Sequence, residues 1–388
     1  MLVKLSLIAA LVTLANAAPS TTTSAAAKPT AAPLLPIPAY SGKLVGAYPP
    51  VDVTAPTDTP LVKQWLAELN LTSVPVFPVT KFDAAGDLLN PNSVPAAACD
   101  WTVTNCINKD IINCPKGIWG LTYDDGPTTF SPQLYDFLDE TDQKATLFYI
   151  GSNVVTNPDI ARRACAAGHQ IAVHTWSHNP STTLTNEQFV AEVKYTEMAI
   201  KELCGFTPTY FRPPYGDIDN RIRGLLDQMG YTSVIWDIDT NDWQMAPGGT
   251  RTEAEVDTAF DQWVAGAGNL TVGHVCLEHE LYQNSVTSAI TNLPKIQKTW
   301  KAMPVSACVN DPHPYHEKNI TLATLNGAKT GVTSNTTLTT TGGSATTSGT
   351  SATVTPAGTG KSSGASVKSL GAGAVVAAVA FAAASLGL

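Results

Sequence analysis

The chain has 388 residues with 32 acidic and 23 basic side chains, and its formal net charge of −9 argues against nucleic acid as a partner. Its seven cysteines include no CxxC pair, which argues against a zinc site made of thiolates. In an oxidising compartment we expect them to form disulfides, and the odd count leaves at least one unpaired in a monomer.

The N-terminal segment has the features of a secretory signal peptide. Lys4 precedes an apolar stretch at 5–15, and small residues lie before a cleavage point that ends the predicted signal, 1–17. A membrane anchor is the alternative, but the apolar stretch is shorter than the ~20 residues that span a bilayer. Residues 18–98 begin rich in Pro, Ala and Thr. We interpret them as an N-terminal extension that either packs on the main domain or acts as a pro-region.

Residues 99–312 are predicted to form one domain. Apolar runs typical of strands alternate with segments of helical spacing, and two capping-box patterns, Thr185 with Gln188 and Thr252 with Glu255, mark helix starts. This alternation predicts an α/β fold, most simply a distorted (β/α) barrel of about seven parallel strands. The predicted strands are 118–123, 145–150, 170–173, 209–211, 232–236, 271–277 and 303–305.

Polar motifs follow several of these strands, and in such barrels the carboxyl ends of the strands carry the chemistry. Asp124 and Asp125 follow the first strand in the series DDGP, which alone is equally compatible with a turn. His174 and His178 lie four residues apart after a later strand. Two histidines and one carboxylate leave coordination positions open, as a catalytic metal site requires. We therefore expect a divalent metal, zinc by default, with cobalt able to substitute.

Three further motifs follow later strands. Arg212 lies beside two prolines on a stiff segment, from which a guanidinium can orient a carboxylate. Asp239 opens the series DTNDW, and His279 ends an apolar strand in LEH. Alone, such a histidine is more often a structural residue, but beside the other motifs it becomes a candidate general acid.

The C-terminal part changes in composition. Most of 313–363 is Ser, Thr, Gly and Ala, which predicts an extended O-glycosylated stalk. Small residues around the predicted attachment point, Ser363 or Gly364, precede an apolar stretch, so that 364–388 resembles a GPI-attachment signal that is removed; a tail-anchored helix is the alternative. We expect a protein of the outer plasma-membrane face and cell wall. Asn-x-Ser/Thr sites predict glycosylation at Asn70, Asn269, Asn319 and Asn335.

The ordered series TYDDGP, HTWSH, RPPYG, DTNDW and LEH resembles the five motifs of the polysaccharide deacetylases of carbohydrate esterase family four, the NodB homology domain. Fungal chitin deacetylases look most similar. The resemblance covers about 118–306, roughly half of the chain. Tyr123 stands where the family's first motif more often has Phe, which is a conservative change.

The resemblance implies roles for the residues around the expected metal. Asp124 would be the catalytic base, and Arg212 would hold it in place. Asp125, His174 and His178 would bind the metal.

The resemblance also implies roles on the other side of the site. His279 would be the general acid and Asp239 would tune it. The backbone amide of Tyr215 would stabilise the oxyanion, and Trp243 and Leu277 would form the walls of the pocket for the acetyl methyl group.

These roles imply metal-dependent removal of N-acetyl groups from chitin, giving chitosan and acetate. Two alternatives are an O-acetyl polysaccharide esterase and a wall glycoprotein with an inactive deacetylase domain; all motif residues are present, which disfavours the second. Trp176, Trp243 and Tyr215 lie in the motif loops, so we expect their faces to pack against sugar rings. The expected partners are chitin or its oligomers and, through the anchor, a membrane. We expect a monomer.

Overall fold

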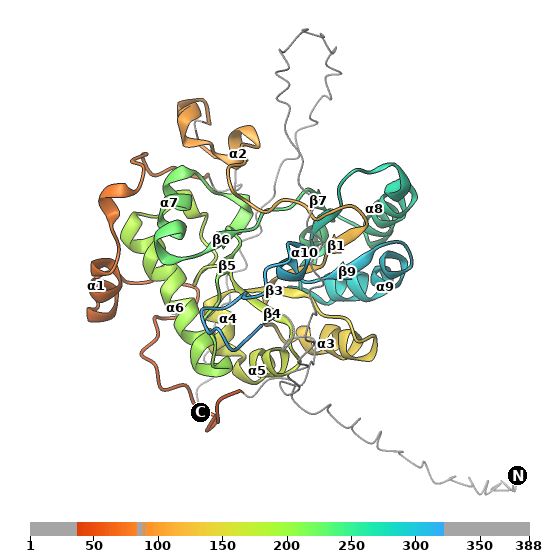
Figure 1. Cartoon of the computed structure of the whole chain (residues 1–388), viewed down its shortest axis with the longest axis horizontal. Helices are drawn as coiled ribbons and strands as arrows, with labels where there is room; N and C mark the ends of the chain where they lie inside the picture. The colour runs from red at the N-terminus through yellow and green to blue at the C-terminus, as the bar shows by residue number, and fades with distance from the viewer. Residues whose placement is uncertain (1–36, 84–87, 90, 322–388) are drawn as a thin grey trace, which may run out of the picture. The chain divides into compact units, whose positions relative to one another are not determined.

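The computed structural model describes residues 37–83, 88–89 and 91–321 (Figure 1). The predicted signal peptide, most of the predicted stalk and the predicted GPI signal lie outside these ranges. Within them, no helix combines the length and the apolar character that crossing a membrane requires.

In the described part of the chain, nine short strands form two sheets, and every pairing between neighbouring strands is parallel. The five-stranded sheet has the order β2 (Thr122–Gly126), β3 (Thr146–Tyr149), β4 (Gln170–Val173), β5 (Tyr210–Phe211) and β6 (Thr232–Ser233). The four-stranded sheet has the order β7 (Ile238–Asp239), β8 (His274–Leu277), β1 (Ile118–Gly120) and β9 (Lys301–Met303). Leu121, which separates β1 from β2, bonds to both sheets: its N–H donates to the carbonyl of Met303 in β9, and its carbonyl accepts from the N–H of Thr146 in β3, both at 2.9 Å.

Helices alternate with the strands, as the sequence predicts for an α/β fold. The α-helices are α1 (Pro60–Ala67), α2 (Trp101–Thr104), α3 (Ser131–Glu140), α4 (Gly151–Thr156), α5 (Pro158–Ala166), α6 (Asn186–Cys204), α7 (Asn220–Met229), α8 (Glu253–Gly266), α9 (Gln283–Thr299) and α10 (Val305–Cys308). The short 3-10 helices are η1 (Leu71–Ser73), η2 (Pro91–Ser93), η3 (Ala96–Ala98), η4 (Ser181–Thr183), η5 (Pro214–Gly216), η6 (Asp242–Met245) and η7 (Ala267–Asn269).

Local sequence explains several of these boundaries. Both predicted capping boxes are present, at Thr185 for α6 and at Thr252 for α8, and α6 ends at Gly205 in a left-handed conformation. The predicted strand 303–305 is wrong at its end, because Pro304 has no N–H for a ladder and precedes α10 instead. The short strand β7 was not predicted, since two residues give no readable alternation.

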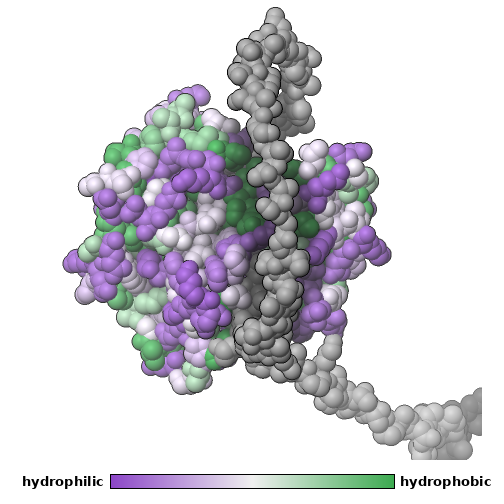
Figure 2. Space-filling view, viewed as in Figure 1, coloured by the Kyte–Doolittle hydropathy of each residue, from purple (hydrophilic) through white to green (hydrophobic). Residues whose placement is uncertain are grey.

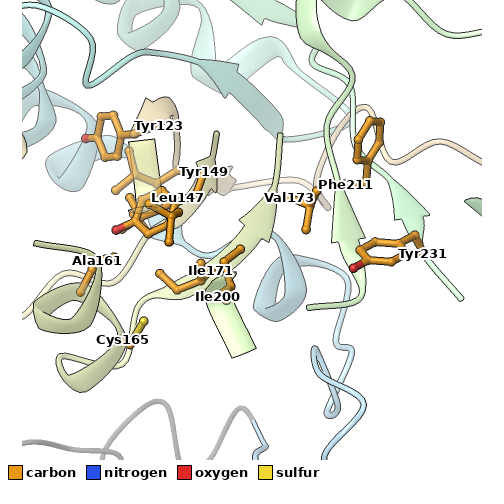
Figure 3. Packing of buried hydrophobic residues seen from close by; sticks show 14 of the residues in the cluster. Tyr123, Leu147, Tyr149, Ala161, Cys165, Ile171, Val173, Ile200, Phe211 and Tyr231 are labelled. Carbon is orange, nitrogen blue, oxygen red and sulfur yellow. The ribbon is translucent and has the colours of Figure 1, made fainter. Parts of the chain in front are cut away.

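The largest core cluster takes buried residues from strands of both sheets and from helices α3 to α9, and Figure 3 shows a part of it around the five-stranded sheet. Strands β2 to β4 are buried along their whole length, which is typical of parallel strands covered on both faces. Leu147 and Ile171 on neighbouring strands contribute to this cluster together with Ala161 and Cys165 of α5 and Ile200 of α6. Outside the core, hydrophilic residues are spread over the face in Figure 2, with smaller hydrophobic areas between them.

Six of the seven cysteines form disulfides, and Cys276 is free and buried. The bond Cys114–Cys308 joins the segment before β1 to α10 and closes a loop with a sequence separation of 194. The other two bonds are Cys99–Cys106 and Cys165–Cys204.

The N-terminal extension packs on the domain where it is described. Helix α1 buries Val62, and Ala55 just before it is also buried, in a cluster that includes Ala191 and Tyr195 of α6. The packed unit therefore begins well before residue 99, the predicted start of the domain.

Candidate active site

The end of β2 directs two adjacent carboxylates into different surroundings. Asp124 continues the strand: its N–H donates to the carbonyl of Glu278 at 2.9 Å, and its carbonyl accepts from the N–H of Glu280 at 3.0 Å. Asp125 has φ +69° and lies at a register shift in the pairing with β3. A residue in the left-handed region interrupts the strand alternation, so the two side chains have separate partners.

Asp124 is held by Arg212, which follows β5. The guanidinium Nη1 donates to Asp124 Oδ1 and to Thr122 Oγ1, both at 2.7 Å, and Nη2 donates to a backbone carbonyl at 3.3 Å. Arg212 is 0% exposed, and its guanidinium lies 4.2 Å from the ring centroid of Phe148. Burial lowers the pKa of Arg212, while the Asp124 carboxylate partly restores it. This is the contact that the family resemblance implies between Arg212 and Asp124.

Asp125, His174 and His178 lie together at the carboxyl ends of β2 and β4, which flank β3 in the sheet. One ligand atom from each falls within 4.8 Å of the others. Asp125 Oδ1 is 3.4 Å from His174 Nε2 and 3.2 Å from His178 Nε2, yet it is buried without a hydrogen bond. His174 Nδ1 lies 2.7 Å from the carbonyl of Arg212, so it carries the proton and leaves Nε2 as the ligand atom.

These three residues fit a divalent metal. An orphaned buried carboxylate oxygen facing two imidazole nitrogens is a donor set that zinc and related ions bind. Burial raises the pKa of Asp125, but His178 and His174 outweigh burial and hold the pKa well below its usual range. The carboxylate is therefore ionised, as a metal ligand must be.

His279 lies two residues after the end of β8, in the four-stranded sheet, and its imidazole pairs with Asp242. Asp242 Oδ1 lies 2.7 Å from His279 Nδ1, and Asp242 Oδ2 accepts from the N–H of His279 at 2.8 Å. Asp239 instead accepts from the N–H of Asn241 at 2.7 Å. The cause is local: Asn241 has φ +55° and turns the chain, so Asp242 at the start of η6 faces the imidazole. Asp242 is therefore the hydrogen-bond partner of His279, while the charge of His279 still acts on Asp239, so the tuning role that the resemblance implies for Asp239 stays a prediction.

The electrostatics of this dyad follow from its burial and its neighbours. Burial lowers the pKa of His279, but Asp242, and then Asp125 and Asp124, raise it to about 10. Burial raises the pKa of Asp239 to about 6, against the opposing effects of the Asn241 amide and the charge of His279. His279 thus carries a proton at neutral pH, as a general acid must.

The predicted substrate-lining residues have different exposures. Tyr215 is 53% exposed, and its ring centroid is 4.8 Å from that of His178. Leu277 is buried and Trp243 is partly buried. Trp176 was predicted to contact sugar, and this is wrong: it is fully buried, the ring of Tyr48 stacks on it, and its Nε1–H donates to the carbonyl of Pro50 in the extension at 3.0 Å.

Sequence reasoning missed two tryptophans next to the RPPYG motif. Trp101 and Trp236 are partly buried and their ring centroids are 5.0 Å apart. Gly216, beside Tyr215, has φ +70°, and a Cβ there would lie 2.4 Å from Trp101. The contact between Trp101 and Gly216 links segments more than a hundred residues apart, so no local pattern could have revealed it.

The predicted glycosylation sites Asn70, Asn269 and Asn319 are exposed. Asn335 and the predicted GPI attachment residues, Ser363 or Gly364, lie outside the described residues.

Comparison with known proteins places the chain in a family. A family described as polysaccharide deacetylase matches residues 112–234. Chitin deacetylase 1 of Cryptococcus neoformans var. grubii is 43% identical over 69% of this chain and 59% of the relative, and chitin deacetylase 2 of the same organism is 37% identical over 77% of this chain and 69% of the relative.

A solved structure of the chitin deacetylase from the fungal pathogen Colletotrichum lindemuthianum is 31% identical, with a TM-score of 0.49, and covers 53% of this chain and 94% of that one. The chain spans less than two thirds of the length of the first relative named above. On the family match, the relative that is 37% identical and its five motifs, the chain belongs to the polysaccharide deacetylase family.

Proposed function

We propose that this protein is a metal-dependent N-deacetylase that hydrolyses the acetyl groups of N-acetylglucosamine units in chitin, giving chitosan and acetate. The observation that carries the proposal is the pairing of the Asp125, His174 and His178 cluster with a held carboxylate, Asp124, and a protonated histidine, His279. The relatives named as chitin deacetylases support the substrate.

Each residue of the site has a part in amide hydrolysis. A divalent ion held by Asp125, His174 and His178 would supply Lewis acidity, which activates water and polarises a carbonyl. Asp124, oriented by Arg212, takes a proton from the attacking water. The backbone N–H of Tyr215 supports the developing oxyanion. His279 gives its proton to the departing amine, and Asp242 keeps Nδ1 protonated so that Nε2 faces the leaving group.

Charge supports a neutral polymer as substrate. Arg212 is the only Lys or Arg in the five motifs, and it is fully buried in an ion pair with Asp124. No Lys or Arg side chain of the motifs is therefore left to attract an anionic polysaccharide. The exposed Tyr215 ring beside His178 offers an apolar face on which a sugar ring packs.

Acetate release tests the proposal. The zinc-loaded protein should release acetate from a chitin hexamer far faster than from single N-acetylglucosamine, because distant sugars contribute binding energy at the reacting centre. Equal rates on both would contradict an extended binding site. Faster release from acetylxylan than from the hexamer would instead support an O-acetyl esterase, and no release from either would support an inactive domain.

We further propose that the protein is secreted and held at the cell surface by a GPI anchor. Three disulfides and three exposed glycosylation sequons among the described residues support passage through an oxidising compartment. Deleting residues 365–388 should convert a surface-bound protein into a freely secreted one with unchanged specific activity. Retention at the surface after the deletion would contradict the anchor.

A further inference from the structure

A buried glutamate of α6 holds the loop between the two histidines of the metal cluster. Glu192 is 0% exposed. Its Oε2 accepts from the backbone N–H groups of Trp176 at 2.8 Å and Ser177 at 2.7 Å, and its Oε1 accepts from Ser177 Oγ at 2.9 Å. All three donors lie between His174 and His178, so this carboxylate fixes the backbone that spaces the two imidazoles.

The same carboxylate binds the N-terminal extension. Glu192 Oε1 also accepts from the N–H of Ala55 at 2.8 Å, across 137 residues of sequence. Asn179, one residue after His178, donates to Thr54 Oγ1 at 2.9 Å. The extension and the histidine loop therefore share one buried anchor.

The extension also covers Trp176 at the centre of the loop. Besides the bond from Trp176 Nε1 to the carbonyl of Pro50, the ring of Tyr48 stacks on the indole at 5.9 Å with an interplanar angle of 1°. The N–H of Asp52 donates to Ser152 Oγ at 2.9 Å, and that hydroxyl donates to the carbonyl of Trp176 at 2.7 Å. Residues 48–55 thus contact the histidine loop from the side of α4 and α6.

The loop needs this support because two of its residues have unfavourable backbone conformations. Thr175 has φ +64° and His178 has φ +57°. Each such conformation costs on the order of 1–3 kcal/mol for a residue other than glycine, and it persists only where the surroundings determine it. A threonine is β-branched, which makes the left-handed region still less favourable.

We propose that Glu192 and residues 48–55 form a built-in clamp that sets the metal affinity of the His174–His178 loop. Glu192 is a positioning residue: it does not contact the metal, but it fixes the backbone of two of its ligands. The extension is accordingly a permanent part of the active enzyme and not a removable pro-region. The inference rests on the proposed function, since it presupposes that the cluster binds a metal.

Zinc affinity of the full-length protein, measured by competition with a chromogenic chelator, tests the clamp. Glu192→Gln keeps the size of the side chain but replaces one of its two acceptor oxygens by an NH2 group. That NH2 group would face N–H or O–H donors and could not accept their hydrogen bonds. We expect its zinc Kd to rise about 10–100-fold, the range typical of residues that support metal ligands. Wild-type affinity in this variant would overturn the inference.

Helix α6 offers a matched control in Glu202, which binds the extension without contacting the histidine loop. Its carboxylate accepts from the N–H groups of Val45 at 2.5 Å and Gly46 at 3.0 Å and from the hydroxyl of Tyr48 at 2.6 Å. We expect Glu202→Gln to keep the wild-type zinc Kd. An equal loss of affinity in both variants would mean that the change reflects general destabilisation, which would overturn the specific role of Glu192.

A second pair of variants keeps the test decisive if Glu192→Gln does not fold. Tyr48→Leu removes the ring that stacks on Trp176, whereas Tyr48→Phe keeps the ring and loses only the hydroxyl. We expect a weaker zinc affinity in Tyr48→Leu alone, and equal affinities in the two would overturn the role of the extension. A wild-type protein that binds no zinc would overturn the metal site itself, and the clamp with it.

Discussion

The two halves of the site come from different sheets and are held in different ways. The metal half follows β2, β4 and β5 of the five-stranded sheet, and its parts support one another: the Arg212 carbonyl orients His174 while the Arg212 guanidinium holds Asp124. The acid half follows β7 and β8 of the four-stranded sheet, and it consists of one dyad, His279 with Asp242, formed across the turn into η6.

The halves meet where the strand carrying Asp124 bonds to the strand carrying His279. Asp124 and His279 form a parallel bridge, flanked by the backbone bonds of Asp124 with Glu278 and Glu280. Two carboxylates of the metal half, Asp125 and Asp124, also help to raise the pKa of His279. Substitutions in the metal half should therefore remove the metal or the base, whereas substitutions in the acid half should change the pH dependence of turnover.

The largest effect should come from the metal ligands. His174→Ala combined with His178→Ala removes two of three ligands, so we expect bound metal and activity to be lost while the fold persists, because the apolar core lies apart from the site. Metal analysis and circular dichroism measure the two outcomes. Stoichiometric metal in the double variant would contradict the ligand assignment.

The next effect should come from the base. Asp124→Asn cannot accept a proton, so we expect turnover to fall by about 10²–10⁴-fold while the metal stays bound. Turnover of zinc-loaded protein on a chitin hexamer measures it. A near-wild-type rate would show that another group takes the proton.

A smaller effect should come from the partner of the acid. Asp242→Asn removes the carboxylate that raises the pKa of His279, and we expect turnover to fall by about 10²-fold. The acid works only when protonated, so wild-type activity should decline as pH rises toward about 10. In the variant the pKa falls toward its ordinary value, and the alkaline limb of the pH–rate profile moves to lower pH. An unmoved limb would rule out this dyad.

The smallest effect should come from Asp239, the residue that, by the family resemblance, would tune His279. Asp239→Asn keeps an acceptor for the N–H of Asn241, so we expect turnover to fall by less than about tenfold, or about 1.4 kcal/mol. The pH–rate profiles of Asp239→Asn and Asp242→Asn are measured under the same conditions and compared. A larger displacement of the alkaline limb in Asp239→Asn than in Asp242→Asn would make Asp239 the main residue that tunes His279.

The sequence predicts the metal half well because its residues directly follow recognisable strands. Asp125, His174 and His178 need only parallel strands whose carboxyl ends lie at the same edge of the sheet to come together. The acid half also follows strands, but its dyad depends on the left-handed turn at Asn241. Two aspartates three residues apart look equivalent in sequence, and one backbone angle decides which of them reaches His279.

Long-range packing explains why the prediction for Trp176 was wrong. Trp176 lies in a motif loop and so was expected at the surface, but the contacts that bury it come from Tyr48 and Pro50, more than a hundred residues away. Prolines and small residues in the extension give no periodic pattern that predicts such packing. The alternation of strands and helices in the sequence predicts the fold class. The clamp on the histidine loop depends on contacts between distant segments, which only the structure shows.

A zinc titration of acetate release tests most directly whether the two halves act as one deacetylation site. Metal-free protein is given a chitin hexamer and increasing zinc, and acetate and free amine are both measured. The rate should rise with zinc and level off at one equivalent, with one amine formed for each acetate released. Acetate release that does not depend on zinc, or no release at any zinc concentration, would contradict the account.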